Sequence, residues 1–197
     1  MKQPIANFKN FATDHKQSFI VGAWAGAAVL FLIALFFYNN PPFVQYQPAD
    51  ACTLFTPSEA EDLLGDHVSN VETDKPVISG DTATSKCGYG DTTLDQSTRK
   101  VAAVAIRSGI NDRGVKQNKS EFRTSESNNK ATSTPIDSLG DDAYFNSVNG
   151  QLNVLDGRKW LIISYGVGST PQSNTIDDTV TLAHLVLGDR QPNLPQF

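Results

Sequence analysis

The sequence predicts an α+β domain with an antiparallel sheet and packed helices, preceded by a single transmembrane helix. Three observations support this fold class. Residues 19–38 form an uninterrupted apolar run, Asn149-Gly150 and Asp156-Gly157 each separate alternating segments, and amphipathic helical patterns occupy both ends of the region beyond residue 50. We divide the chain into a cytoplasmic tail, a transmembrane helix, a linker, an extracytoplasmic domain and a second tail, at residues 1–18, 19–38, 39–50, 51–190 and 191–197.

Charge and length orient the apolar run. At about 1.5 Å per residue, residues 19–38 reach roughly 30 Å as a helix, the thickness of a bilayer core. Three lysines precede the run, and the first basic residue after it is Lys75. The positive-inside rule therefore predicts a cytoplasmic N-terminus, with residues 39–197 outside the plasma membrane. These outer residues carry 13 basic and 20 acidic side chains without a basic cluster, which argues against nucleic acid as a partner.

Other roles for the run are weaker. A cleaved signal peptide has an apolar region of about 7–15 residues with a cleavage site close behind. The small-residue site Ala49-Asp50-Ala51 lies too far downstream, and the same spacing argues against a lipoprotein acylated at Cys52. Gly22 and Gly26 form a small-xxx-small pattern, so a homodimer packed through the membrane helix is a further alternative.

The two cysteines, Cys52 and Cys87, both lie in the outer part. In an oxidising compartment two thiols most simply form one disulfide. Two free buried thiols are the alternative. Metal binding is the weakest of the three readings, because no further Cys or His lies at ligand spacing.

The outer domain begins with a well-marked helix: Thr56 as N-cap, Pro57 and Glu59 in the first turn, and Gly65 at its end. Residues 66–80 show no readable pattern. Strands are predicted over 82–90 and 99–107, and the apolar residues on both faces of 101–106 favour a central strand that is covered on both sides. Two alternatives stay open for the polar region 110–136, a helix over about 114–127 or a mobile loop. The last helix is predicted over 175–187.

The two Gly-containing turns predict a three-strand meander over 143–148, 151–155 and 158–165. With two-residue turns, one face is apolar and belongs to the core: Phe145, Leu152, Val154, Leu161 and Ile163. The other face also holds Leu155 and mixes aromatic with polar groups, which suits a sugar or a peptide. Its candidate ligand-binding residues are Tyr144, Asn146, Asn153, Arg158 and Trp160. The alternative is that helices cover this face and Trp160 packs beneath them.

Signals for catalysis are weak. No Gly-x-Ser-x-Gly, His-Glu-x-x-His or Walker loop is present, and the three histidines are widely spaced, so we predict no catalytic residue, metal site or cofactor. Asp141 is the most interesting acidic residue, because it directly precedes the strand that bears Tyr144. A structural turn explains Asp141 better, which leaves a hydrolase that uses acidic residues as the enzyme alternative.

Three motifs in order carry a resemblance: Cys52-x3-Thr56-x2-Glu59-Ala60-x2-Leu63-Leu64-Gly65, then Cys87-Gly88-Tyr89, then Leu139-Gly140-Asp141-Asp142-Ala143-Tyr144. Together they resemble a family of uncharacterised cell-envelope domains seen mainly as lipoproteins of actinobacteria. The resemblance implies an extracytoplasmic domain with no established enzymatic activity, and pairing of Cys52 with Cys87. This chain departs from the family in having a transmembrane helix in place of the lipid anchor.

We therefore expect an anchored binding module whose partner is another envelope protein, a cell-wall component or a small molecule. The alternatives are the anchored hydrolase and a structural subunit that dimerises through its membrane helix.

Overall fold

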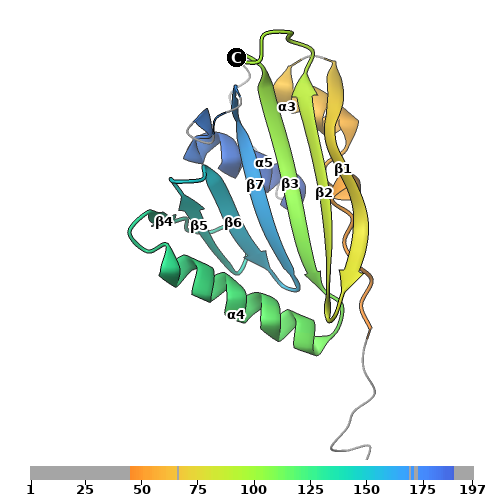
Figure 1. The fold of residues 1–197 in the computed structure, drawn as a ribbon, viewed down its shortest axis with the longest axis vertical. Helices are drawn as coiled ribbons and strands as arrows, with labels where there is room; N and C mark the ends of the chain where they lie inside the picture. Colours follow the sequence, from red (N-terminus) through yellow and green to blue (C-terminus); the bar gives the residue numbers. More distant parts are fainter. Residues whose placement is uncertain (1–44, 66, 169, 171–172, 189–197) are drawn as a thin grey trace, which may run out of the picture. The chain divides into compact units, whose positions relative to one another are not determined.

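Seven antiparallel strands form one sheet in the order β1-β2-β3-β7-β6-β5-β4 (Figure 1). The computed structural model describes residues 45–188 except 66, 169, 171 and 172. The strands are β1 (Val68–Ser79), β2 (Thr82–Asp91), β3 (Lys100–Gly109), β4 (Ser133–Pro135), β5 (Asp142–Asn146), β6 (Gln151–Asp156) and β7 (Lys159–Val167). The helices are α2 (Ala51–Leu54), α3 (Pro57–Leu64), α4 (Asp112–Asn128) and α5 (Ile176–Leu187). The predicted α+β class with an antiparallel sheet is confirmed.

The predicted membrane helix over 19–38, including Gly22 and Gly26, lies outside the described residues. Within residues 45–188, with the gaps given above, no helix is long and apolar enough to span a bilayer.

The two faces of the sheet are covered unequally. Helices α2, α3 and α5 pack on one face, which we call the inner face, and α4 lies across part of the other, the outer face (Figure 1). The inner face carries the main core. It includes all five meander residues predicted to be buried, namely Phe145, Leu152, Val154, Leu161 and Ile163.

Both predicted hairpins form, with turns that differ from the expected ones. The first turn has four residues, 147–150, and the second is centred on Gly157 and Arg158, so that Asp156 pairs with Lys159. Gly150 and Gly157 have φ of 61° and 55°, in the left-handed region that favours glycine. Each register differs by two residues from the one implied by two-residue turns at Asn149-Gly150 and Asp156-Gly157. A shift of two residues keeps every side chain on its face, so the predicted faces survive.

The helix boundaries follow the sequence signals. The hydroxyl of Thr56 and the carboxylate of Glu59 form a complete capping box at the start of α3, which ends at Gly65. The polar segment 110–136 contains the helix alternative: α4 begins after Asn111, whose side chain accepts the Gly114 N–H. Helix α5 is capped by Thr175.

The segment without a readable pattern, 66–80, contributes β1, an edge strand that pairs only with β2. Almost all of its residues are exposed, and its pairing is interrupted between Asn70 and Glu72 and between Asp74 and Val77. An edge strand that is exposed on both faces has no reason to alternate polar and apolar residues, and this explains the absent pattern.

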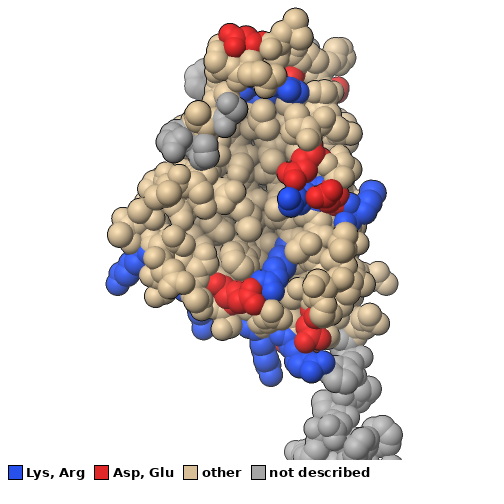
Figure 2. Space-filling model, in the orientation of Figure 1, with Lys and Arg blue, Asp and Glu red and all other residues tan. Residues whose placement is uncertain are grey.

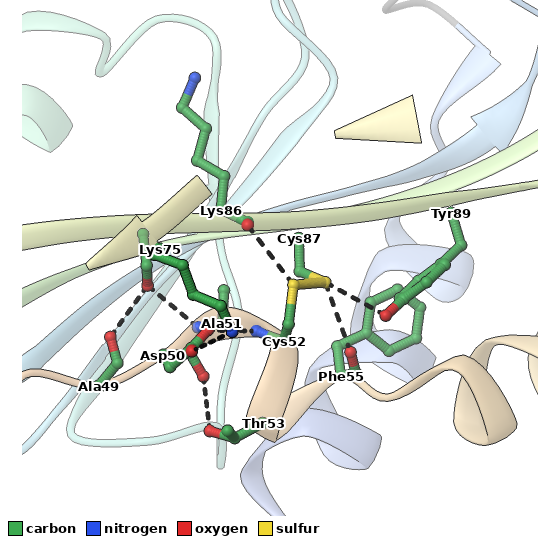
Figure 3. Close-up of polar contacts among 11 residues, drawn as sticks. Ala49, Asp50, Ala51, Cys52, Thr53, Phe55, Lys75, Lys86, Cys87 and Tyr89 are labelled. Atoms are coloured by element: carbon green, nitrogen blue, oxygen red, sulfur yellow. Dashed lines mark hydrogen bonds and ion pairs between the residues drawn. A yellow bond between two sulfur atoms is a disulfide. The ribbon is translucent and has the colours of Figure 1, made fainter. Parts of the chain in front are cut away.

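The first residues of the domain are fastened to β2 (Figure 3). Cys52 and Cys87 form a disulfide with Cα atoms 5.1 Å apart, as predicted. The Ala51 N–H donates to Ser85 Oγ at 3.0 Å, and the rings of Phe55 and Tyr89 meet edge to face at 5.2 Å. The disulfide is therefore one of several attachments between α2 and the sheet.

The same packing encloses the Tyr89 hydroxyl, which lies 3.4 Å from Cys87 Sγ. A disulfide sulfur carries no proton, so the hydroxyl is the donor. Burial raises the pKa of Tyr89, with a smaller contribution from Glu59.

Candidate functional site

Helix α4 covers the part of the outer face where the predicted ligand-binding residues lie. Tyr144 is 1% exposed, and its hydroxyl donates to Ser125 Oγ on α4 at 2.8 Å. The Phe122 ring on α4 lies 5.1 Å from the Tyr144 ring and 5.9 Å from the Trp160 ring. These aromatic residues form a second, small core with Leu155. The predicted alternative, in which helices cover this face and Trp160 packs beneath them, describes the structure.

The amide side chains of the predicted set are also used internally. Asn153 is buried and accepts the Trp160 Nε1–H at 3.1 Å. Asn146 is buried as well, and its Oδ1 accepts the Val148 N–H at 2.9 Å in the turn that follows β5. Neither amide is presented to an external ligand.

Arg158 does not lie on the strand face where the sequence placed it. Its position in the β6–β7 turn brings its guanidinium over the ring of Tyr46, 4.3 Å from the centroid. The Arg158 carbonyl accepts hydrogen bonds from the Gly109 N–H and from Asn118 Nδ2. The structure thus places Tyr144, Asn153 and Trp160 in one internal cluster. Asn146 lies at the turn after β5 and Arg158 in the β6–β7 turn, so the five predicted residues do not form one open binding surface.

The outer face remains open over β2, β3 and β7, beyond the edge of α4. Strand pairing places Gly88, Ala103 and Ser164 in one row across these strands, and Lys86, Ala105 and Ile162 in the next row. We call the open surface floored by Gly88, Val101, Ala103, Ala105, Ile162 and Ser164 the trough. Figure 2 views this face, and its middle is recessed and free of charged side chains.

The floor of the trough is apolar without being part of either core. Val101, Ala103, Ala105 and Ile162 are all half-buried, and none of them belongs to the inner core or to the cluster beneath α4. The prediction that 101–106 is covered on both sides is therefore wrong for this stretch of the outer face. On the inner face of the same strand, Ala102, Val104 and Ile106 are at most 1% exposed.

Small residues line the trough, so its floor lies slightly below the surrounding side chains. A Cβ added at Gly88 would lie 3.2 Å from both Ala103 Cβ and Val71 Cγ2, so the strand surface is already closely packed there. At Gly90 a Cβ would lie 2.7 Å from the Arg99 guanidinium, which folds back over the strand and donates to Ser69 Oγ. Glycine at these two positions lets neighbouring side chains rest directly on the backbone.

Charged pairs border the trough on its right and lower sides in Figure 2. Lys86 Nζ lies 2.9 Å from Glu72 on one side, and Arg107 pairs with Glu121 of α4 at another. Its hydrogen bond to Glu72 raises the pKa of Lys86, while Arg107, helped by Gln117, lowers the pKa of Glu121. The two pairs form a polar rim beside an apolar floor.

Asp141 and His67 make local contacts. Asp141 accepts the Gly157 N–H at 3.1 Å and lies 3.9 Å from Lys119, so it fastens the β6–β7 turn near α4. His67 Nδ1 lies 3.5 Å from Glu61. Among the described residues, no group of three or more His, Cys, Asp or Glu side chains is arranged to hold a metal ion.

One signal in the sequence could have indicated the trough. In β3 the outward positions hold Ala103 and Ala105, where a strand packed beneath a helix usually carries larger β-branched or aromatic side chains. Gly88 lies beside Ala103 on the neighbouring strand. Small apolar residues on the outward face of adjacent strands indicate a surface without a covering layer.

Comparison with protein-family models, with curated proteins and with solved structures finds no match to this chain. The resemblance to actinobacterial envelope domains therefore stays a prediction. The fold and the trough define the class as a disulfide-containing α+β domain with an open, apolar-floored sheet face.

Proposed function

We propose that this protein is a single-pass, membrane-anchored, extracytoplasmic binding module of the bacterial cell envelope. Residues 19–38 serve as the anchor, and the trough binds a segment of another envelope protein. The observation that carries the proposal is the apolar floor of the trough, which is half-accessible and belongs to neither core.

The form of the trough favours a protein segment over a small molecule. Small-molecule sites are concave cavities that bury most of the ligand surface. Protein interfaces instead combine an apolar centre with a polar rim on a shallow surface. Here Ala103, Ala105 and Ile162 supply the centre, and the Glu72–Lys86 and Arg107–Glu121 pairs supply the rim.

The proposed location rests on the apolar run, the lysine asymmetry and the disulfide. Disulfides persist in extracytoplasmic compartments and are rare in reducing ones, so the Cys52–Cys87 bond supports an outside position for the domain. Intact-mass measurement of the purified membrane protein tests whether the anchor is retained. The uncleaved chain has a mass of 21.4 kDa, and cleavage near Ala51 would remove about a quarter of its residues.

Site-specific photo-crosslinking in living cells tests the binding role. Benzoylphenylalanine replaces Ile162 in the trough of the full chain, and replaces Leu94, which is 96% exposed in the loop after β2, as the control. We expect a discrete cross-linked protein from position 162 and none from position 94. Equal cross-linking from both positions, or none from position 162, would contradict the proposal.

A charge placed in the trough provides the matched perturbation. Ala105→Arg introduces a long cationic side chain into the floor, whereas Leu94→Arg adds the same charge to an exposed loop. The cross-link from position 162 should disappear with Ala105→Arg and persist with Leu94→Arg. Persistence with both variants would show that the partner does not use the trough.

A further inference from the structure

The first described residues attach to one end of the sheet. The Tyr46 N–H donates to the Ile110 carbonyl at 2.8 Å, and the Tyr46 hydroxyl donates to the Asp112 carboxylate at 2.7 Å. The Arg158 guanidinium lies over the same ring. We call this end, where Tyr46, the β1–β2 hairpin and the start of α4 meet, the tether end. The chain that leads from residues 19–38 therefore joins the domain beside α4.

Two exposed apolar side chains lie at the tether end. Val77 and Ile78, near the end of β1, are 63% and 56% exposed. The hairpin that follows them is joined to α4, because the Asp81 carbonyl accepts the Ile110 N–H and the Asp81 carboxylate lies 3.4 Å from Arg113 Nε. Val77 and Ile78 point to opposite faces of β1, and Val77 shares the outer face with α4 because it pairs with Thr84, which in turn pairs with Arg107. The hairpin and the first turn of α4 therefore lie together at the tether end.

The outward side of α4 is basic, although residues 39–197 carry an excess of acidic side chains. Gly114, Asn118 and Phe122 turn towards the sheet, which leaves Arg113, Lys116 and Arg123 on the exposed side. Blue side chains line the lower edge of Figure 2, where Figure 1 places α4.

A shallow depression on this side of α4 is lined by Lys116, Lys119, Arg123 and the hydroxyl groups of Ser120, Thr124 and Ser127. In the part of the chain that the structure describes, neither Lys116 nor Arg123 forms an ion pair. Both cations can therefore bind an anion without first breaking an internal contact.

We propose that the tether end and the basic side of α4 dock on the anionic phospholipid headgroups of the membrane that anchors the chain. The inference rests on the anchor proposed above and adds an orientation for the domain. The chain from Tyr38 to Tyr46 spans at most roughly 25–30 Å, which keeps the tether end close to the headgroups. The cationic side chains of Lys116 and Arg123 bind the lipid phosphates, and the side chains of Val77 and Ile78 insert at the boundary between headgroups and acyl chains.

This orientation leaves the trough accessible. The loop after β2 that contains Leu94 lies at the opposite end of the sheet, because β2 runs from the β1–β2 hairpin to Asp91. A domain docked by its tether end thus exposes the far end of the sheet and the open outer face to a partner in the envelope.

Fluorescence quenching by brominated phospholipids tests the docking with the full chain in vesicles. In a Trp24→Phe background, Ile78→Trp places a probe at the tether end and Leu94→Trp places one at the far end. The background chain, which retains Trp160 beneath α4, provides the baseline. Vesicles consist of phosphatidylcholine alone or of phosphatidylcholine with one quarter phosphatidylglycerol.

We expect quenching at position 78 to exceed that at position 94 several-fold in the anionic vesicles, and to fall in phosphatidylcholine alone. Each cation near an anionic surface is worth about a five-fold change in local partitioning. Lys116→Glu should therefore reduce quenching at position 78, whereas Lys100→Glu at the far end of β3 should not.

Vesicle flotation separates the two proposals. A chain that floats with the vesicles but is quenched equally at positions 78 and 94 keeps its anchor and overturns the docking. Equal quenching at position 78 in both lipid mixtures, or with Lys116→Glu and Lys100→Glu alike, also overturns it. A chain that does not float overturns both the anchor and the docking.

Discussion

Removing the Cys52–Cys87 disulfide should lower the free energy of unfolding by about 3.8 kcal/mol. The two cysteines are 35 residues apart, and the chain-entropy model assigns this amount to a closed loop of that length. The effect arises in the unfolded chain, which becomes free to explore conformations that the closed loop forbids. The native contacts around Ala51 and Phe55 remain as alternative attachments of α2 and α3.

The substitution should be Cys52→Ala with Cys87→Ala. Cys87 is fully buried in the inner core, so a serine there would add a hydroxyl to an apolar site and confuse loop entropy with desolvation. Chemical reduction of the unchanged chain provides the matched comparison, because it opens the loop and leaves both sulfur atoms in place. The difference between the two measurements isolates the loss of sulfur packing.

Urea unfolding of the full chain in mild detergent measures the effect. In the Trp24→Phe background Trp160 is the sole tryptophan, and it packs beneath α4 on the opposite face from the disulfide. Its fluorescence therefore reports unfolding of the whole sheet. A loss below about 1 kcal/mol would refute the loop-entropy reasoning, and free thiols in the unreduced protein would refute the disulfide itself.

Three further predictions use the same assay. Thr56→Ala removes the hydroxyl half of the α3 capping box and should cost about 1 kcal/mol, and an unchanged midpoint would contradict that role. Phe122→Ala empties the centre of the cluster beneath α4 and should cost about 3–5 kcal/mol, whereas Thr124→Ala on the exposed side should stay within about 0.5. The hydrogen bond from Lys75 lowers the pKa of Asp50 in the folded chain. The stability that this pair contributes is therefore fully present above the unfolded pKa of about 4, and it is lost as the pH falls through the lower pKa of the folded state. Asp50→Asn should therefore weaken the chain at neutral pH and flatten its loss of stability below pH 4, and an unaltered acid profile would exclude the pair as a contributor.

Elements whose signals are local could be predicted from the sequence. The capping box needs only Thr56 and Glu59, and the second hairpin needs only the Asp156-Gly157 turn between alternating strands. The first turn is longer than predicted and the second is displaced by one residue. The predicted faces stay intact, because each register differs by two residues, the period of a strand. Inner-face residues such as Leu152 and Leu161 were identified for this reason.

Helix α4 shows why the position of a helix over the sheet could not be predicted. The residues that face the sheet along its length are Gly114, Asn118 and Phe122, so only one of them is large and apolar. Asn118 is held by hydrogen bonds from its Nδ2 to the carbonyls of Arg107 and Arg158, contacts that depend on the folded sheet. A helix with a single large apolar residue on its buried face carries a weak hydrophobic signal in its sequence.

Because α4 covers the mixed face around Tyr144, the candidate site is the trough and not that face. The mixed face around Tyr144 looked suitable for a ligand because aromatic and amide groups share it, yet the same groups satisfy one another once Phe122 and Ser125 lie above them. Beyond the edge of α4, no helix within the described part of the chain covers Ala103 and Ala105, and the apolar surface there stays half-accessible. Exposing an apolar patch of this kind to water costs free energy, and burial against a partner would remove that cost. For that reason the proposed binding role depends on the small residues of β3, whose side chains leave room for a second surface, and not on the aromatic residues that first suggested a site.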